Sequence, residues 1–371
     1  MTRLPRRIWR GFRRLLRVVS RPVRRDRGLR GVVIQPYRGY GTSDEIYLMG
    51  RVFRQPRLGA GLPMGSVLKE VGDVARRLGR WGLGRVKVKA RMAGTSATLL
   101  TDRDGYFHIE LTPRQMLDPT QHWHSVELEV TWKGETATAT GLVYVPPPSA
   151  RRVVISDIDD TVMHTGVANK AKMLWRLFVQ GAESRTAFPG VAEFYQALHE
   201  GASGGEGNPM LYVSRAPWSI YEVLESFFRL NKIPEGPVLF LREWGLTLQR
   251  PLPRRARHHK HDLIEDMLAR YPHLPFVLIG DSGQHDPEVY ADIVRRHPDR
   301  VEAVYIRDVS DTEARAGEIR QLWRETRMAG SPLVLTDNSA AMAEHAAHIG
   351  LVPTNPPTGA PTTRERVSVK R

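Results

Sequence analysis

Carboxylates follow two apolar runs in this chain, and each run has the length and composition of a buried strand. Val153–Ser156 precedes Asp157 and Asp159, and Phe276–Gly280 precedes Asp281. A short run of apolar residues without alternation is typical of a strand buried on both faces, as in a parallel sheet. In open α/β sheets, binding crevices form outside the carboxyl ends of the strands. The two acidic groups are therefore expected at one edge of one sheet, where they could do chemistry together.

Two further polar residues are expected at the same edge. Ser214 ends the apolar segment Met210–Val213, and Lys260 stands at the start of an amphipathic helix. If these segments belong to one sheet, the hydroxyl and the ammonium group converge on the carboxylates. A calcium-binding EF-hand loop is excluded for the first acidic stretch, because Thr161 and Val162 occupy the positions that need an oxygen ligand and a turn glycine.

Strand and helix signals alternate through the carboxyl-terminal part of the chain, which predicts right-handed crossovers and a sheet covered on both faces. The expected strands lie near residues 153–156, 210–214, 238–241, 276–280, 301–306 and 332–335, and the expected helices near 191–200, 218–230, 260–270, 287–297, 313–328 and 338–348. The predicted fold class is α/β, with a doubly wound, mostly parallel sheet.

The preceding region has short alternating segments, which are typical of antiparallel strands. The expected strands cover residues 31–37, 45–53, 85–92, 106–111, 125–132 and 135–145, and a helix is expected from Ser66 to Trp81. A small β-sandwich with one inserted helix fits this pattern. The region has no acid pair or metal-spaced cluster, so a supporting or interacting module is expected. Pro146–Pro148 makes a stiff joint to the α/β region.

Four regions are thus predicted: a basic arm (1–30), a β-domain (31–148), an α/β domain (149–350) and a disordered tail (351–371). The chain has 371 residues, of which 41% are apolar, and this suffices for ordinary buried cores. The absence of cysteine excludes disulfides, thiolate catalysis, cysteine-ligated zinc and iron–sulfur clusters. No apolar stretch approaches a bilayer-spanning length.

The formal net charge of +15 is concentrated in the basic arm. Residues 1–31 contain twelve Arg and one acid, which leaves about +4 for the rest of the chain. One side of the arm carries apolar residues at helical spacing, namely Ile8, Phe12, Leu15 and Val19. With Arg on the other side, the arm is expected to form a basic amphipathic helix. Arg interrupts every apolar run, which excludes a secretory signal peptide.

Several interpretations of the arm remain. Residues 3–19 could lie on an anionic membrane surface, where each Arg contributes about 1 kcal/mol before screening by salt. The arm could instead dock on the protein body, stay disordered or act as a mitochondrial transit peptide. Nucleic acid is not expected as a partner, because phosphate contacts would leave Phe12 and its apolar neighbours exposed. The membrane interpretation predicts a cytoplasmic, peripherally membrane-associated protein; the sequence predicts no oligomeric state.

The motifs of the α/β region resemble those of the haloacid dehalogenase superfamily of phosphohydrolases, whose four short motifs match Asp157 with Asp159, then Ser214, Lys260 and Asp281. A closer resemblance is to the catalytic domain of the actin-patch-protein type of phosphatidate phosphatase, distantly related to lipins. It is carried by the segments Asp157–Thr161, Phe188–Val191, Val213–Trp218 and Gly280–Gln284. The resemblance runs from about residue 150 to 350 and does not include the β-domain.

This resemblance implies a magnesium-dependent phosphatase that acts through an aspartyl-phosphate intermediate. Mg²⁺ would be held by Asp157, the carbonyl of Asp159 and Asp281, and would offset the charge of the phosphate. Asp157 would attack phosphorus. Asp159 would protonate the departing alcohol and later take a proton from water, and crowding by neighbouring acids should raise its pKa.

The remaining motif residues are expected to bind the phosphate. Lys260 and the Ser214 hydroxyl would stabilise the phosphoryl oxygens in the transition state. Thr161 and Arg215 would contact the substrate, although Arg215 is equally compatible with a surface ion pair. The catalytic residues implied by the resemblance are therefore Asp157, Asp159, Ser214 and Lys260.

Other polar residues near the motifs have competing interpretations. Asp286 is expected to support the catalytic lysine or the metal ligands, although an acid directly before Pro287 is as typical of a helix cap. Three histidines are expected in a solvated basic loop in preference to a transition-metal site, namely His258, His259 and His261.

The predicted substrate is phosphatidate, which would be hydrolysed to diacylglycerol and phosphate. Residues 170–179 combine basic residues with Trp175, which suits a flap over a lipid substrate or an ordinary amphipathic helix packed on the sheet. Two alternative functions are a phosphatase for a soluble or nucleic-acid terminal phosphate monoester, and a non-catalytic lipid-binding module on the same fold. The presence of every motif acid argues against the last.

Overall fold

The computed structural model describes residues 29–56, 81–158, 161–162, 187–214, 221–240, 256–310, 312–328 and 330–354. Parts of the sequence interpretation concern residues outside these ranges: the basic arm, nearly all of the helix expected at 66–81, Asp159, Arg215, the segment 170–179 and most of the tail. None of the helices among the described residues has the length and apolar character of a bilayer-spanning helix.

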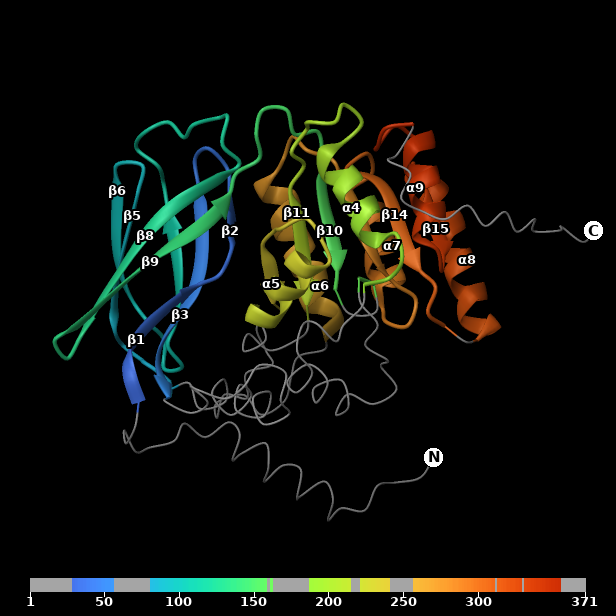
Figure 1. Ribbon diagram of the computed structural model, residues 1–371. Coiled ribbons are helices and arrows are strands. Elements are labelled where there is room, and N and C mark those ends of the chain that lie inside the picture. Colours follow the sequence, from blue (N-terminus) through green and yellow to red (C-terminus); the bar gives the residue numbers. More distant parts are fainter. Residues whose placement is uncertain are drawn as a thin grey trace, which may run out of the picture.

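Six strands in the carboxyl-terminal part of the described chain form an all-parallel sheet in the order β12-β11-β10-β13-β14-β15 (Figure 1). They are β10 (Val153–Asp157), β11 (Met210–Ser214), β12 (Val238–Phe240), β13 (Phe276–Asp281), β14 (Val301–Arg307) and β15 (Leu333–Thr336). The predicted α/β class and the parallel sheet are confirmed.

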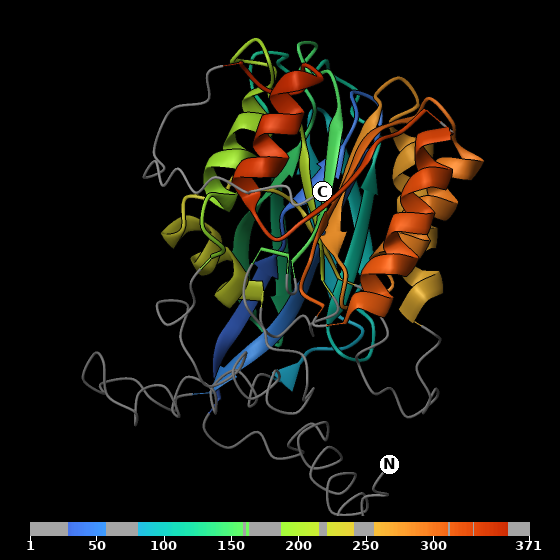
Figure 2. The ribbon, with the colours of Figure 1, turned by 90° about the vertical axis from the view of Figure 1, so that its right-hand side faces the viewer.

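Helices cover both faces of this sheet (Figure 2). One apolar core includes residues of α4 (Val191–Glu200), α5 (Tyr221–Leu230) and α9 (Ser339–His348), and the other includes residues of α6 (Ala256–Arg270), α7 (Asp286–Arg296) and α8 (Glu313–Met328). Val154 packs in the first core and its neighbour Ile155 in the second. Burial on both faces explains why these strands are unbroken apolar runs in the sequence. Leu351 and Val352 also lie in the first core, so the packed structure extends into the expected tail.

The described residues from 29 to 144 form a second sheet of nine strands, which is mainly antiparallel. Its order is β1-β3-β2-β9-β8-β5-β6, with β4 and β7 also paired to β3, and the pair β2–β9 is parallel. The strands are β1 (Leu29–Pro36), β2 (Gly39–Gly41), β3 (Ile46–Pro56), β4 (Trp81–Gly82), β5 (Lys87–Met92), β6 (Thr95–Leu100), β7 (Tyr106–Leu111), β8 (Trp123–Trp132) and β9 (Glu135–Tyr144). Alternate residues such as Val88 and Val130 form a separate third core.

Three details of this sheet differ from the prediction. Strand β2 (Gly39–Gly41) lies outside the expected strands. Strand β6 was not expected, because its side chains alternate between half-buried and exposed, and none is fully buried. It therefore lacks the hydrophobic alternation that marks a strand in a sequence. Trp81 lies in β4, paired with Arg54, where the sequence predicts the end of a helix.

The segment between β1 and β2 contacts the start of α5. The backbone N–H of Arg38 donates to the Tyr221 hydroxyl at 2.7 Å, and the Arg38 guanidinium forms an ion pair with Glu225 at 3.3 Å. The rings of Tyr37 and Tyr221 lie 4.5 Å apart. Because Tyr221 is the first residue of α5, the antiparallel sheet contacts the helix that follows the Ser214 segment.

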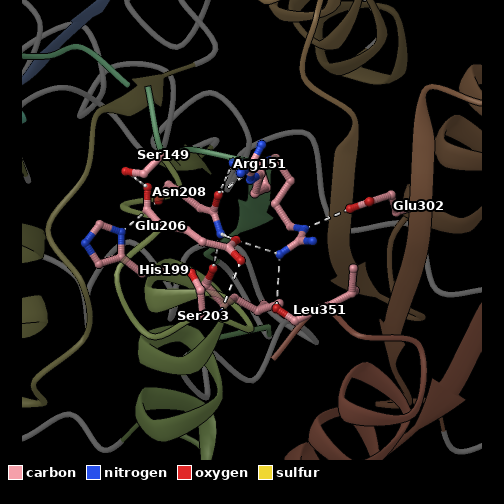
Figure 3. A network of polar contacts seen from close by, with 10 residues as sticks. Ser149, Arg151, His199, Ser203, Glu206, Asn208, Glu302 and Leu351 are labelled. Atoms are coloured by element: carbon pink, nitrogen blue, oxygen red, sulfur yellow. Dashed lines mark hydrogen bonds and ion pairs between the residues drawn. The ribbon is translucent and has the colours of Figure 1, made fainter. Parts of the chain in front are cut away.

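A buried polar network (Figure 3) lies at the amino-terminal edge of the parallel sheet, among the residues that directly precede β10 and β11. The Asn208 Oδ1 accepts hydrogen bonds from the backbone N–H groups of Arg151 and Arg152, and its Nδ2 donates to the carbonyl of Leu198 and to Glu206. The Arg152 guanidinium also pairs with Glu206 at 3.0 Å. All four hydrogen-bonding positions of the Asn208 amide are thus used, and the residue is fully buried.

We expect Asn208→Ala to lower the free energy of unfolding by about 3 kcal/mol, because it leaves several buried donors and acceptors unsatisfied. Denaturant unfolding followed by circular dichroism measures this change. Gln196→Ala on α4 is a matched control, since this exposed side chain pairs with the exposed Glu200 and its loss should cost less than about 0.5 kcal/mol. Equal stability of the two variants would contradict a stabilising role for the network.

Candidate active site

Lys260 and Asp157 meet at the carboxyl edge of the parallel sheet. Asp157 is the last residue of β10, which lies between β11 and β13. Lys260 lies near the start of α6, and its Nζ donates to Asp157 Oδ1 at 2.5 Å. The two side chains are 1% and 0% exposed. Buried charges are tolerated when they are paired and hydrogen-bonded, so the contact fixes both side chains at this edge.

Asp286 is a second carboxylate in contact with Lys260. Its Oδ1 accepts from the Lys260 Nζ at 2.6 Å, and its Oδ2 accepts from the backbone N–H of Asp281 at 3.3 Å. Asp286 is the first residue of α7, and His285 occupies the N-cap position. Of the two roles considered from the sequence, the observed contacts are those of a residue that supports the lysine.

Gly280 provides the space for the Asp286 carboxylate. A Cβ atom at position 280 would lie 2.4 Å from Asp286 Oδ2 and 2.7 Å from Asp286 Cβ, which is closer than real Cβ contacts. Any side chain at this position of β13 would therefore displace Asp286. Glycine is required here for packing, since it lets the backbone lie against a buried carboxylate.

Asp281 is the last residue of β13, and the side-chain amide of Gln284 lies between its carboxylate and that of Asp157. The Gln284 Nε2 donates to Asp281 Oδ2 at 2.7 Å and lies 3.5 Å from Asp157 Oδ2. Asp281 is fully buried. The Gln284 side chain therefore sets the position of one carboxylate and reaches the second.

Asp157, Asp281 and Asp286 have the arrangement of a cation site. One oxygen atom from each carboxylate lies within 4.8 Å of the others, and all three residues are buried. The three carboxylates carry three negative charges when ionised, and in the contacts described above Lys260 contributes one positive charge. A divalent cation would offset the other two negative charges. Carboxylate oxygens are the donors that hard cations such as Mg²⁺ prefer. The residues therefore fit a divalent cation.

Arg307 connects the loop after Asp157 to the start of α9. The Arg307 Nε donates to the carbonyl of Thr161 at 3.1 Å, and its Nη2 donates to the Ser339 hydroxyl at 2.6 Å. The guanidinium lies over the ring of Phe188, 4.1 Å from its centroid. Burial lowers the pKa of Arg307. Thr161 itself is 1% exposed, and its hydroxyl has no hydrogen-bond partner among the described residues.

Ser214 lies at the same edge as Asp157. The register of β10 and β11 pairs Asp157 with Val213, so Ser214 is one residue further along the neighbouring strand, and it is fully buried. The structure thus brings Asp157, Ser214, Lys260 and Asp281 to one edge of the sheet. Asp159, Asp160 and Arg215 lie outside the described residues.

The expectation of a basic loop around Lys260 is wrong. Helix α6 begins at Ala256, so His258, His259 and His261 are helical. His261 Nε2 lies 3.1 Å from Asp292 Oδ2 on α7, and its Nδ1 lies 3.8 Å from Asp262. Helical periodicity from Ala256 was hidden in the sequence because several charged residues and histidines open the helix, which gives it little apolar pattern.

An open cavity of about 720 Å³ lies away from this edge, next to the end of α6. Met116, Pro147 and Tyr271 are among its lining residues, and none of the acids described above lines it. Its place at the far end of α6 from Lys260 separates it from the candidate active site.

Two residues at the site were not assigned a role from the sequence. Gln284 belongs to the Gly-Asp-Ser-Gly-Gln segment, of which the sequence interpretation uses only Asp281. Arg307 ends the apolar run of β14 and pairs in register with Asp281 at the end of β13. The rule that identified Asp281, a polar residue at the carboxyl end of a buried strand, would also have identified Arg307.

Comparisons with known proteins show what the segment that carries most of these residues is similar to. Residues 152–308 match the family described as the catalytic domain of phosphatidate phosphatase APP1. The chain is 32% identical over 160 residues to phosphatidate phosphatase APP1 of Saccharomyces cerevisiae, which covers 43% of this chain and 26% of the yeast protein. It is 26% identical over 156 residues to an uncharacterized protein of Schizosaccharomyces pombe, which covers 42% of this chain and 25% of that protein. The chain thus matches about a quarter of the length of these relatives, and the resemblance predicted from the motifs is confirmed for this segment.

Similarity to solved structures is weak. A carbohydrate acetylesterase from Xanthomonas citri aligns with a TM-score of 0.30 and 11% identity, over 84% of this chain and 72% of that chain. A minor pilin from Streptococcus sanguinis aligns with a TM-score of 0.28 and 8% identity, over 72% of this chain and 87% of that chain. Alignments at this level carry no argument about fold or function.

We expect Gly280→Ala to weaken Mg²⁺ binding by roughly 10-fold or more, because the new methyl group must displace the Asp286 carboxylate. Isothermal titration calorimetry on the metal-free protein measures this affinity. Gly317→Ala on α8 is the control, since a Cβ there meets no atom within 4 Å and alanine favours the helix. Unchanged affinity in a folded Gly280→Ala variant would show that Asp286 does not belong to the cation site.

Proposed function

Because residues 152–308 match the catalytic domain of phosphatidate phosphatase APP1, we propose that this chain is a magnesium-dependent phosphatase that hydrolyses phosphatidate to diacylglycerol and phosphate. The observation that carries the proposal is the contact of Lys260 with Asp157, beside Asp281 and Asp286, inside the matched segment. A buried lysine and three carboxylates at a strand edge suit a phosphate monoester and a divalent cation.

Asp157 is the nucleophile in this proposal. Its carboxylate forms a bond to phosphorus while the bond from phosphorus to the diacylglycerol oxygen breaks, and water then cleaves the aspartyl-phosphate. The contact of Lys260 with Asp157 Oδ1 restricts rotation of the carboxylate and places a positive charge where the phosphoryl oxygens would lie. The carboxylates of Asp157 and Asp281 and the backbone carbonyl of Asp159 would hold Mg²⁺, which would offset the negative charge of the phosphate.

Proton transfer is assigned to Asp159, which stands two residues after the nucleophile. It protonates the departing alcohol oxygen and then accepts a proton from the attacking water. Ser214, at the end of β11, donates a hydrogen bond from its hydroxyl to a phosphoryl oxygen. Thr161 and Arg215 are proposed to contact the substrate. The buried Thr161 hydroxyl supports this, because it has no partner among the described residues and remains able to donate.

We further propose a fold for each region of the chain. An acid at the end of a central parallel strand, with a lysine on a following helix, supports a haloacid dehalogenase-like fold for residues 149–350. The separate third core supports a β-sandwich-like domain at 31–148, with the basic arm at 1–30 before it and the tail at 351–371 after the catalytic domain.

Membrane access is proposed to come from the basic arm. Phosphatidate is an anionic lipid that stays in the bilayer, so the enzyme must reach a charged surface. Residues 3–19 carry the arginines and the apolar stripe that a peripheral amphipathic helix needs. The protein is accordingly proposed to be cytoplasmic and peripherally membrane-associated, with the phospholipid as its substrate.

The central test is phosphate release from phosphatidate in mixed micelles with Mg²⁺, compared with a panel of soluble monoesters. We expect Asp157→Asn to lower the rate by at least about 10³-fold, because it removes the nucleophile. Asp159→Asn should show a loss of about 10²-fold or more. Asp262→Asn on the exposed side of α6 is the control and should retain wild-type activity.

Fast turnover of a soluble ester without turnover of phosphatidate would contradict the lipid assignment. Magnesium-independent release that survives Asp157→Asn would contradict the enzymatic assignment itself.

Deletion of residues 1–30 should reduce binding to vesicles that contain phosphatidate by roughly 10-fold or more, because several arginines each contribute about 1 kcal/mol. Vesicle co-sedimentation at two salt concentrations measures the effect. Activity on a water-soluble monoester should be unchanged, which separates membrane binding from catalysis. Deletion of residues 355–371 is the control, and an equal loss of binding there would contradict a specific role for the arm.

A further inference from the structure

Two of the three clustered carboxylates are joined by one short loop. Asp281 is the last residue of β13 and Asp286 is the first residue of α7, so residues 282–285 alone separate them. The conformation of this loop therefore determines how far apart the two carboxylates lie. Any group that fixes the loop backbone also fixes the geometry of the cation site.

Arg315 on α8 holds this loop through its backbone. The Arg315 Nε donates to the carbonyl of Ser282 at 2.9 Å, and its Nη2 donates to the carbonyl of Gln284 at 2.7 Å. A guanidinium group is planar and presents its donors in a rigid fork. The side chain of Arg315 thus sets the distance between the carbonyl groups of Ser282 and Gln284.

The Arg315 guanidinium is itself held in place. Both of its Nη atoms donate to the carboxylate of Glu288, and Nη1 also donates to Glu318 at 3.1 Å. Glu288 lies in the first turn of α7, so the ion pair also joins α8 to the helix that begins with Asp286.

The loop transmits this restraint to the carboxylates. Gln284, whose carbonyl accepts from Arg315, directs its amide to Asp281 at 2.7 Å and toward Asp157 at 3.5 Å. Ser282, the other residue held by Arg315, donates its hydroxyl to Asp308 at 2.9 Å. A movement of the loop backbone would therefore move the amide that lies between two carboxylates.

We propose that Arg315 is a positioning residue for the divalent-cation site, which it controls through the backbone of residues 282–284 and the Gln284 amide. The inference deepens the proposed phosphatase function and rests on it, because it assigns to that site a residue on α8 whose contacts described above go to the loop backbone and to Glu288 and Glu318, not to the three carboxylates.

The test measures Mg²⁺ binding by isothermal titration calorimetry in the absence of substrate, together with thermal unfolding. Arg315→Met should raise the Kd for Mg²⁺ by about 10- to 100-fold. Arg315→Lys retains the positive charge but lacks the planar set of donors of a guanidinium group, so it should raise the Kd less than Arg315→Met does. The control is Arg320→Met, since this exposed residue of α8 pairs with the exposed Glu313, and its Kd should change less than about twofold.

In the phosphatidate assay, the Mg²⁺ concentration for half-maximal rate should rise in Arg315→Met in parallel with the Kd, and saturating Mg²⁺ should restore most of the rate. An unchanged Kd in folded Arg315→Lys and Arg315→Met, whatever their melting temperatures, would overturn the proposal, because a purely structural role predicts that result. So would a wild-type protein that does not bind Mg²⁺. If wild type binds Mg²⁺ without releasing phosphate from phosphatidate, the proposed function fails, while the calorimetric comparison still decides the role of Arg315.

Discussion

The buried contact of Lys260 with Asp157 and Asp286 is the interaction on which the candidate site depends. An ammonium group that is 1% exposed has lost most of its hydration, and removal of water from a charge is costly unless opposite charges replace it. The two carboxylates replace it at 2.5 and 2.6 Å. They come from the end of β10 and the start of α7, so the lysine joins elements that are distant in the sequence. Loss of the lysine would leave carboxylates close together in a site with little water.

The fold supplies the rigidity that this contact requires. Strand β10 has a neighbour on each side and a helical layer on each face, so its last residue cannot move without disturbing two apolar cores. The Gly280 position shows how close the packing is, because the Asp286 carboxylate occupies the volume where a side chain would be. Two arginines also hold the loops at this edge: Arg307 donates to the Thr161 carbonyl, and Arg315 donates to the Ser282 and Gln284 carbonyls.

The sequence predicted the parallel sheet and most of its helices, because strands buried on both faces leave unbroken apolar runs that are easily recognised. It also predicted that Asp157, Ser214, Lys260 and Asp281 would gather at one edge, since parallel strands share their carboxyl end. Strand β6 was missed because its exposed side chains carry little hydrophobic pattern. The first turn of α6, residues 256–259, was missed because charged residues and histidines open this helix. The contacts of Arg315 could not have been predicted, since they depend on how α8 packs beside the loop after β13 and no local pattern encodes that packing.

Chemical trapping can show whether the phosphoryl group is transferred to Asp157, as proposed. Enzyme quenched during turnover of phosphatidate can be treated with borohydride, which reduces an aspartyl-phosphate to homoserine, and the modified residue can be located by peptide mass spectrometry. The account predicts homoserine at position 157 in the wild-type protein and none in Asp157→Asn. Steady turnover with no modification at position 157, or with the modification at a different carboxylate, would contradict the account.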